Sequence, residues 1–254
     1  MKDLAGFVEK VLSDLAGLPE DAMRLGLLGR RLKALDPRHA ALLIDAICRK
    51  GRGGRSSRMA LMALVDPEGL KSALGEEKCA LIYLASIELG LQRVSRLFTD
   101  LQPRKKGLAG YDSEEDAGME FITPGERRAM ARGFKKDSLL RLLSDPDPAV
   151  IGNLLNNPRI TEKDVVRMAS RRPASPGILR LIAGHRIWSK RYGVIRALVL
   201  NPYTPPRISI ALLEVLPAQD LGPAAEDGSL HPQVRLAASE ILKDRNGGDR
   251  GQTF

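Results

Sequence analysis

The side chains that could do chemistry in this chain are mainly cationic, and they are concentrated in one stretch. Residues 127–207 contain 17 Lys and Arg but only 5 Asp and Glu, whereas residues 1–122 contain 19 basic and 18 acidic side chains. A surface dense in guanidinium and ammonium groups attracts polyanions and accelerates their association. We therefore expect the stretch 127–207 to bind an anionic macromolecule.

The candidate contact residues lie in two short segments of this stretch. Arg167 and Arg171 are four residues apart, so they share one face of a helix. Trp188 and Tyr192 lie among further basic residues and could act as hydrophobic anchors. The alternative is a solvated surface in which arginines stabilise helix carboxyl ends through the helix dipole. The predicted partner-binding residues are Arg167, Arg171, Arg172, Arg186, Trp188, Lys190, Arg191 and Tyr192.

Residues that ligate metals or carry out catalysis are few and scattered. His39, His185 and His231 lie far apart, and none has a second ligand at a helical spacing. Cys48 and Cys79 each lie inside an apolar stretch, which favours buried, reduced thiols over a disulfide or a metal site. We expect no metal and no cofactor.

The sequence contains neither a complete phosphate-binding loop nor a familiar catalytic motif. The segment KGRGGRSS, residues 50–57, lacks both the GK[ST] ending of a phosphate loop and a preceding apolar strand. GxSxG, HExxH and paired-carboxylate patterns are absent from the sequence. We therefore predict that the protein is not an enzyme.

The hydropathy pattern indicates a cytoplasmic protein without a membrane span. No run approaches the roughly 18 apolar residues that a transmembrane helix needs. The first ten residues, MKDLAGFVEK, carry acids where a signal peptide requires an apolar core.

The elements that must position these residues are predicted to be helices. Aromatic residues make up only 4% of the chain, and abundant Leu, Ala, Arg and Ile favour helix packing over sheets. Residues 102–122 change character, with basic residues followed by the acidic segment YDSEEDAGME, as in a linker. We expect an N-terminal helical array at 1–101, a charged linker at 102–122, a C-terminal array at 123–245 and a disordered tail at 246–254.

An internal repeat is visible in the C-terminal array. VIGNLLNNP at 150–158 matches VIRALVLNP at 194–202, with a constant offset of 44. Thr123 and Glu126 form a predicted capping box, and further helix caps are expected at about 147, 161, 175, 190, 204, 217 and 231. Short helices at this spacing cannot bury their apolar faces alone, so we expect them to stack.

The positions that follow these caps repeat as well. Apolar residues occur four, seven and eight positions after the cap, which is the spacing of one buried helical face. The predicted buried residues are Ile151, Leu154, Leu155, Val165, Met168, Ala169, Leu179, Ile182, Ala183, Ile208, Ala211 and Leu212.

The proline-containing segments between these helices, which we call joints, resemble a known family of repeats together with the helices themselves. NNPRITEKDVVRMASRRPASPGILRLIA and LNPYTPPRISIALLEVL are similar to leucine-rich repeat variant units, and HPQVRLAASEIL resembles a HEAT repeat. The resemblance covers roughly residues 145–243 and implies a right-handed α-solenoid that presents an extended surface to a macromolecule. The cysteine-ligated iron–sulfur cluster of the best-known leucine-rich repeat variant protein is not implied, because two separated cysteines cannot ligate it.

The resulting expectation is a non-catalytic scaffold that binds an acidic protein partner through a basic surface. A nucleic-acid-binding solenoid is the alternative. A glycosylase-like enzyme is the third possibility and depends on Trp188, the only tryptophan. We also hypothesise that the acidic segment Asp112–Glu120 folds back and masks the basic surface.

Overall fold

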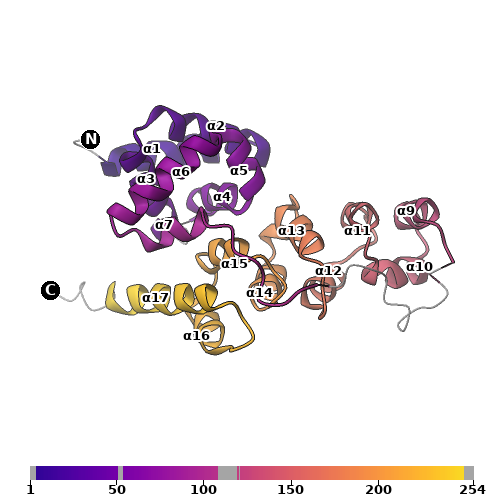
Figure 1. Ribbon diagram of the computed structural model, residues 1–254. Coiled ribbons are helices and arrows are strands. Elements are labelled where there is room, and N and C mark those ends of the chain that lie inside the picture. Colours follow the sequence, from indigo (N-terminus) through magenta and orange to yellow (C-terminus); the bar gives the residue numbers. More distant parts are fainter. Residues whose placement is uncertain (1–3, 51–53, 108–118, 120, 249–254) are drawn as a thin grey trace. The chain divides into compact units, whose positions relative to one another are not determined.

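The protein is all-helical throughout the part that the structure describes. The computed structural model describes residues 4–50, 54–107, 119 and 121–248, and these residues form sixteen α-helices and two short 3-10 helices, with no strand among them. The predicted all-α class is therefore confirmed (Figure 1). The acidic residues of the masking hypothesis and residues 51–53 of the glycine-rich segment lie outside the described residues.

The chain folds into two compact units. Unit 1 combines residues 1–102 with residues 206–254, and unit 2 comprises residues 103–205. The predicted C-terminal array at 123–245 includes residues 206–245, whereas in the structure these residues form one compact unit with residues 1–102. The division within the chain therefore falls at the joint NPYTPP as well as near residue 102.

Unit 1 is built from ten helices in its described part. Seven come from the N-terminal segment and three from the C-terminal segment. They are α1 Leu4–Ala16, α2 Asp21–Ala34, α3 Pro37–Lys50, α4 Arg55–Val65, α5 Pro67–Leu74, α6 Glu76–Glu88, α7 Gln92–Leu97, α15 Pro206–Leu213, α16 Ala218–Glu226 and α17 Pro232–Gly248. The last helix includes residues 246–248 of the predicted tail, and residues 249–254 lie outside the described residues.

The helix α15 joins the two segments of unit 1. It packs against α4, α7 and α17, and seven of its eight residues are buried. A helix that is apolar on most sides needs cover on most sides, and unit 1 supplies that cover from both ends of the chain.

Unit 2 contains six α-helices and both 3-10 helices. In Figure 1 they lie in two rows, with α9, α11 and α13 in one row and α10, α12 and α14 in the other. The strongest contacts are between row neighbours, α9 with α11 and α12 with α14. The bounds are α9 Pro124–Arg132, α10 Lys136–Arg141, η1 Leu142–Ser144, α11 Pro148–Leu155, α12 Glu162–Ser170, α13 Pro176–Gly184, η2 Trp188–Lys190 and α14 Tyr192–Val199.

The predicted caps mark the helix starts. Helices α11 to α17 each begin one or two residues after a predicted cap. Thr123 with Glu126, and Thr161 with Asp164, form complete capping boxes. Two predicted capping hydroxyls are corrected. Ser175 is the N-cap residue of α13 but its side chain makes no capping hydrogen bond. The Thr204 hydroxyl donates to the Leu198 carbonyl at 2.7 Å and so bonds back to the preceding helix.

The predicted buried positions are confirmed. All twelve apolar residues at the fourth, seventh and eighth positions after a cap are buried. The two cysteines are free thiols; Cys48 is buried as predicted, and Cys79 is only half-buried. The local pattern therefore determines which side of each helix faces inward.

Candidate functional site

The joints of unit 2 use asparagine side chains to close the ends of neighbouring helices. Asn157 donates its amide hydrogens to the carbonyls of Ala131 and Gly133, both at 2.8 Å. Asn201 donates in the same way to Ala169 and Arg171, at 2.8 and 2.9 Å. Each asparagine thus bonds the carboxyl end of the preceding helix in its own row. These carbonyls have no partner inside their helix, so the amide supplies one.

Each of these asparagines also accepts a backbone hydrogen bond. The side-chain oxygen of Asn157 accepts from the Arg159 N–H at 2.9 Å, and that of Asn201 accepts from the Tyr203 N–H at 3.0 Å. The sequence match at an offset of 44 is therefore a match of hydrogen-bonding roles. Both asparagines are buried. A buried polar group without a hydrogen-bond partner destabilises the fold, so these bonds are needed.

Trp188 has a similar role after α13. Its indole N–H donates to the Leu155 carbonyl, at the end of α11, at 2.8 Å. Trp188 is only 9% exposed. It packs inside unit 2 and does not present an anchor to a partner, in contrast to its predicted role. The glycosylase hypothesis depends on an exposed tryptophan, whereas the only tryptophan of the chain is buried.

Most acidic side chains described in unit 2 are engaged internally. Glu126 and Asp164 complete capping boxes. Asp147 accepts the Ala149 N–H at the start of α11 and pairs with Arg128 at 2.8 Å. The buried Asp145 pairs with Arg127 at 2.7 Å. Few acids are left to balance the basic residues outside.

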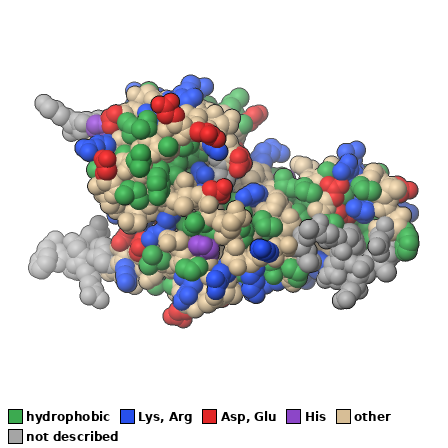
Figure 2. All heavy atoms as spheres, viewed as in Figure 1, with side chains coloured by type: hydrophobic (Ala, Val, Ile, Leu, Met, Phe, Trp, Pro, Cys, Tyr) green, Lys and Arg blue, Asp and Glu red, His purple; other side chains and the backbone are tan. Residues whose placement is uncertain are grey.

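The basic residues, in contrast, are largely exposed. Figure 2 shows Lys and Arg side chains gathered over α12 and α14 with few acids among them. Of the predicted contact residues, Arg167, Arg172, Arg186, Arg191 and Tyr192 are exposed, and Arg171 and Lys190 are half-buried. We call these seven residues the basic surface.

The basic surface consists of two groups at opposite ends of the α12–α14 row. The ends of α12 and α14 lie together, because the Arg172 guanidinium donates to the Leu200 carbonyl. Their starts lie together as well, because a Cβ at Gly193 would meet the side chains of Glu162 and Val166 within 3.3 Å. Along α12 the first group therefore lies between about 8 Å (Arg167) and about 13 Å (Arg171) from the helix start, near which the second group lies. The groups are Arg167, Arg171 and Arg172, and Arg186, Lys190, Arg191 and Tyr192.

Two exposed residues that the prediction omitted lie on the same two helices. Lys163 is in the first turn of α12, four residues before Arg167, and Arg196 is in the middle of α14. The spacing of Lys163 and Arg167 already placed them on one helical face. One acid reduces the positive charge of the basic surface here, because Glu162 lies 3.9 Å from Arg191.

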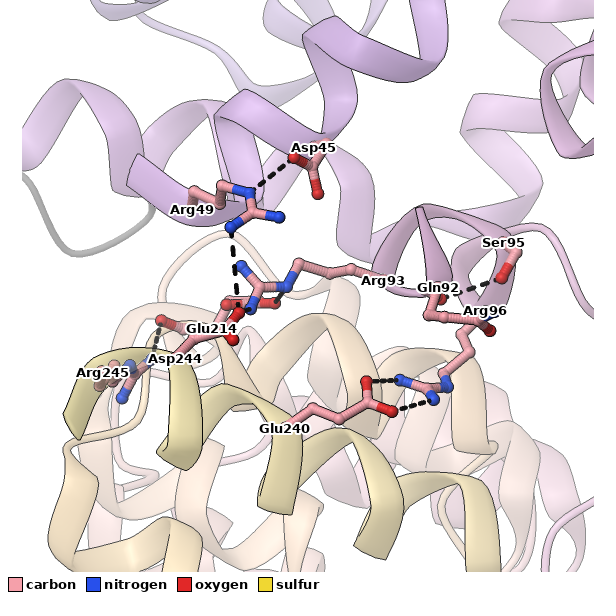
Figure 3. Close-up of polar contacts among 10 residues, drawn as sticks. All are labelled: Asp45, Arg49, Gln92, Arg93, Ser95, Arg96, Glu214, Glu240, Asp244 and Arg245. Carbon is pink, nitrogen blue, oxygen red and sulfur yellow. Dashed lines mark hydrogen bonds and ion pairs between the residues drawn. The ribbon is translucent and has the colours of Figure 1, made fainter. Parts of the chain in front are cut away.

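A second charged site lies in unit 1 and was not predicted. Figure 3 shows Arg93 of α7 directed at two acids of the C-terminal segment. Its Nη2 lies 2.7 Å from Asp244, and its Nε lies 3.0 Å from Glu214 Oε1 at an angle unsuited to a hydrogen bond. The Arg96 guanidinium makes a bidentate ion pair with the Glu240 carboxylate, at 2.6 and 2.8 Å.

One buried acid and one buried thiol at this cluster have raised pKa values. Burial raises the pKa of Glu214 to about 7, with Arg93 and Arg245 opposing the shift and Asp45 and Asp244 adding to it. Burial also raises the pKa of the Cys48 thiol, so this cysteine is a poor thiolate nucleophile.

A cavity of about 320 Å³ adjoins the cluster. Its lining contains three guanidiniums, two carboxylates and one aliphatic side chain, so it has no strong excess of either charge. The carboxylates already have arginine partners, as described above. The lining residues are Arg49, Arg93, Glu214, Ile241, Asp244 and Arg245.

Searches for other kinds of site and for relatives give no assignment. Within the described residues, no group of three or more His, Cys, Asp or Glu side chains could hold a metal ion. Among the described helices, none has the length and apolar character required to cross a bilayer. No protein-family model, curated protein or solved structure matches the chain.

Proposed function

We propose that the protein is a cytoplasmic, non-catalytic helical-repeat scaffold whose unit 2 binds an acidic protein segment through the basic surface. The observation that carries the proposal is that acidic and basic side chains are placed differently in unit 2. Most of its described acids cap helices or pair with a neighbouring cation, whereas several arginines in or next to α12 and α14 are exposed, namely Arg167, Arg172, Arg186, Arg191 and Arg196. The exposed cations around α12 and α14 therefore face solvent with few acids beside them, which favours an anionic partner.

The proposed architecture is a short α-solenoid of the leucine-rich-repeat-variant or HEAT-like kind. The two rows of helices and the equivalent roles of Asn157 and Asn201 support stacking of similar units. Stacked units place equivalent helical faces side by side, which produces an extended surface for a macromolecule.

An acidic protein segment suits this surface better than nucleic acid does. Tyr192 is 47% exposed and Ile187 is 43% exposed, and they adjoin Arg191 and Arg186 in the sequence. Interface cores combine such apolar side chains with arginine. Phosphate recognition would use the same arginines but would not need the isoleucine.

The test compares two anionic probes with the full-length chain. We would measure fluorescence anisotropy of a labelled glutamate-rich peptide and of a labelled DNA or RNA duplex, at about 50 and about 200 mM salt. The triple variant Arg167→Ala, Arg186→Ala, Arg191→Ala should weaken peptide binding by about tenfold or more, because three charge contacts at about 0.5–1 kcal/mol each are lost.

The matched control removes three exposed cations from unit 1. The variant Lys10→Ala, Arg30→Ala, Lys33→Ala has the same change in net charge and should bind the peptide as the unmodified chain does. Duplex binding that is tighter than peptide binding and collapses with salt would favour the nucleic-acid alternative. Equal losses in both triple variants would contradict a localised site.

A further inference from the structure

Helix α6 in unit 1 is apolar on all sides, but only one side is covered. Ile82 and Ala85 are buried against the unit, where α3, α5 and α7 pack on the helix. On the opposite side Leu81, Leu84 and Ile87 are 42%, 57% and 49% exposed. A helix that is apolar all round is typical of a buried position. Figure 2 shows the resulting apolar patch over α6.

The exposed side chains form a continuous stripe. Leu81, Leu84 and Ile87 are each three residues apart, so they lie next to one another along the helix. A single exposed leucine is ordinary on a protein surface. A contiguous apolar stripe on a charged protein is instead typical of an interaction site. We call these three residues, with the exposed Ala80, the α6 stripe.

Acidic residues bound the α6 stripe at both ends. Glu76 and Glu77 lie in the first turn of α6, and Glu88 is its last residue. Lys78 is the only basic residue of the helix, and its ammonium group bonds the Leu35 carbonyl. The exposed face of α6 therefore carries acids and no cation of its own.

The partners of these acids leave them accessible. Glu76 pairs with Lys71 at 2.8 Å and Glu88 with Arg38 at 3.0 Å, in pairs whose side chains are all more than half exposed. Such pairs contribute little and exchange readily for another cation. Glu77 makes no ion pair within the described residues.

This charge pattern decides between possible occupants. A second copy docking α6 on α6 would place acids against acids in the parallel arrangement and in the antiparallel one, because both ends are acidic, and such juxtaposition is costly. An anionic lipid surface would be repelled for the same reason. A partner helix with cations at both ends would instead place opposite charges against the acids at the two ends of α6.

We propose that the α6 stripe is the docking face for an amphipathic helix of another protein, whose apolar side is bounded by Lys or Arg at both ends. The two helices would pack face to face through apolar side chains three or four residues apart. The inference is independent of the proposed function, because it concerns unit 1 and a partner of opposite charge.

The test uses three synthetic helical peptides of the same length as α6, 13 residues. They share one apolar stripe and carry Lys, Glu or Gln at both ends. Fluorescence anisotropy with the full-length chain should show the Lys-ended peptide binding about tenfold more tightly than the Glu-ended one. The double variant Glu77→Lys, Glu88→Lys should reverse that order.

A pair of matched variants locates the binding. Leu84→Gln should weaken the Lys-ended peptide about tenfold, because it removes roughly half of a leucine's burial together with its packing. Leu236→Gln changes a leucine of similar exposure on α17 and should have no effect. Leu81→Gln provides a second stripe variant if Leu84→Gln reduces helicity by circular dichroism.

Three outcomes would overturn the proposal. The first is no binding of the Lys-ended peptide, or binding that both stripe variants leave unchanged. The second is concentration-dependent dimerisation of the chain in sedimentation that is lost in Leu84→Gln, which would make a second copy the occupant. The third is binding to phosphatidylserine vesicles that the same variant abolishes.

Discussion

The two units close the carboxyl ends of their helices with different chemistry. In unit 2 the neutral side chains of Asn157, Asn201 and Trp188 donate to the terminal carbonyls. In unit 1 arginines perform this task. The Arg24 guanidinium bonds the Leu15 and Leu18 carbonyls after α1.

The same use of arginine recurs at the C-terminal end of unit 1. Arg245 donates to the Leu216 and Glu214 carbonyls at 2.6 and 2.9 Å, and Arg235 donates to the Ala225 carbonyl at 3.1 Å. Both units meet the same requirement, because end carbonyls lack partners within their own helix.

This difference determines where the cations of each unit are found. Unit 1 places Arg24 and Arg96 in its interior, so they contribute to packing and are not offered to a partner. Unit 2 closes three of its helix ends with neutral side chains and leaves most of its cations exposed, although Arg172 bonds the Leu200 carbonyl after α14 and Arg127 is buried with Asp145. The charge count of a segment is therefore a poor guide to the charge that a partner meets.

The largest effect is expected from removing the asparagine side chains that close the helix ends of unit 2. Asn201→Ala and Asn157→Ala each remove two donated hydrogen bonds and one accepted bond in a buried place, which should cost about 3–4 kcal/mol. The two losses should be equal, because the roles are equivalent. Trp188 is the only tryptophan and lies in unit 2, so its fluorescence during urea unfolding reports this unit.

Asn156→Ala serves as the control for both variants. Asn156 is exposed, donates to the Gly152 carbonyl and has its Oδ1 3.4 Å from His185 Nε2. Because both contacts are exposed to solvent, its loss should change the free energy of unfolding by less than about 0.5 kcal/mol. Unequal costs at 157 and 201, or a cost at 156 as large as either, would contradict the equivalence of the two joints.

The stability of unit 1 should depend on pH through Glu214. The folded-state pKa of Glu214 is raised from 4.5 to about 7, so the folded state binds the proton more tightly than the unfolded state. This contribution to stability is fully present below the unfolded pKa and is lost as the pH rises through about 7. Glu214→Gln removes the dependence.

The measurement is the difference in the free energy of unfolding between Glu214→Gln and the unmodified chain. It should shift in favour of the variant by on the order of 3 kcal/mol between about pH 4 and about pH 8. Hydrogen exchange of α15 and α17 should follow the same trend, while α11 and α12 should not. A shift of the opposite sign would mean that Arg93 outweighs burial.

The smallest expected effect tests the assignment of Trp188 to the interior. Trp188→Phe keeps the aromatic packing and removes one hydrogen bond, so it should cost about 1 kcal/mol. Hydrogen exchange at the end of α11 should increase. Binding of the glutamate-rich peptide should be unchanged, and a loss of that binding in a folded variant would restore Trp188 as a contact residue.

The sequence by itself determined the helices and their inward faces. Thr161 with Asp164 forms the cap that its spacing predicts, and Val165, Met168 and Ala169 are buried as their periodicity requires. These features depend on residues within two turns of one another. Local hydrogen bonding and a period of 3.6 residues are therefore sufficient to predict them.

Only the tertiary structure decided which helices share a core and which charges are hidden. Arg93 and Glu214 are far apart in the sequence, and nothing local to either indicates that they meet in unit 1. The capping signal before α15 resembles those before α12 and α13, yet α15 packs with α4 and α7. Burial depends on contacts between distant segments, so a local pattern specifies that a face must be covered but not what covers it.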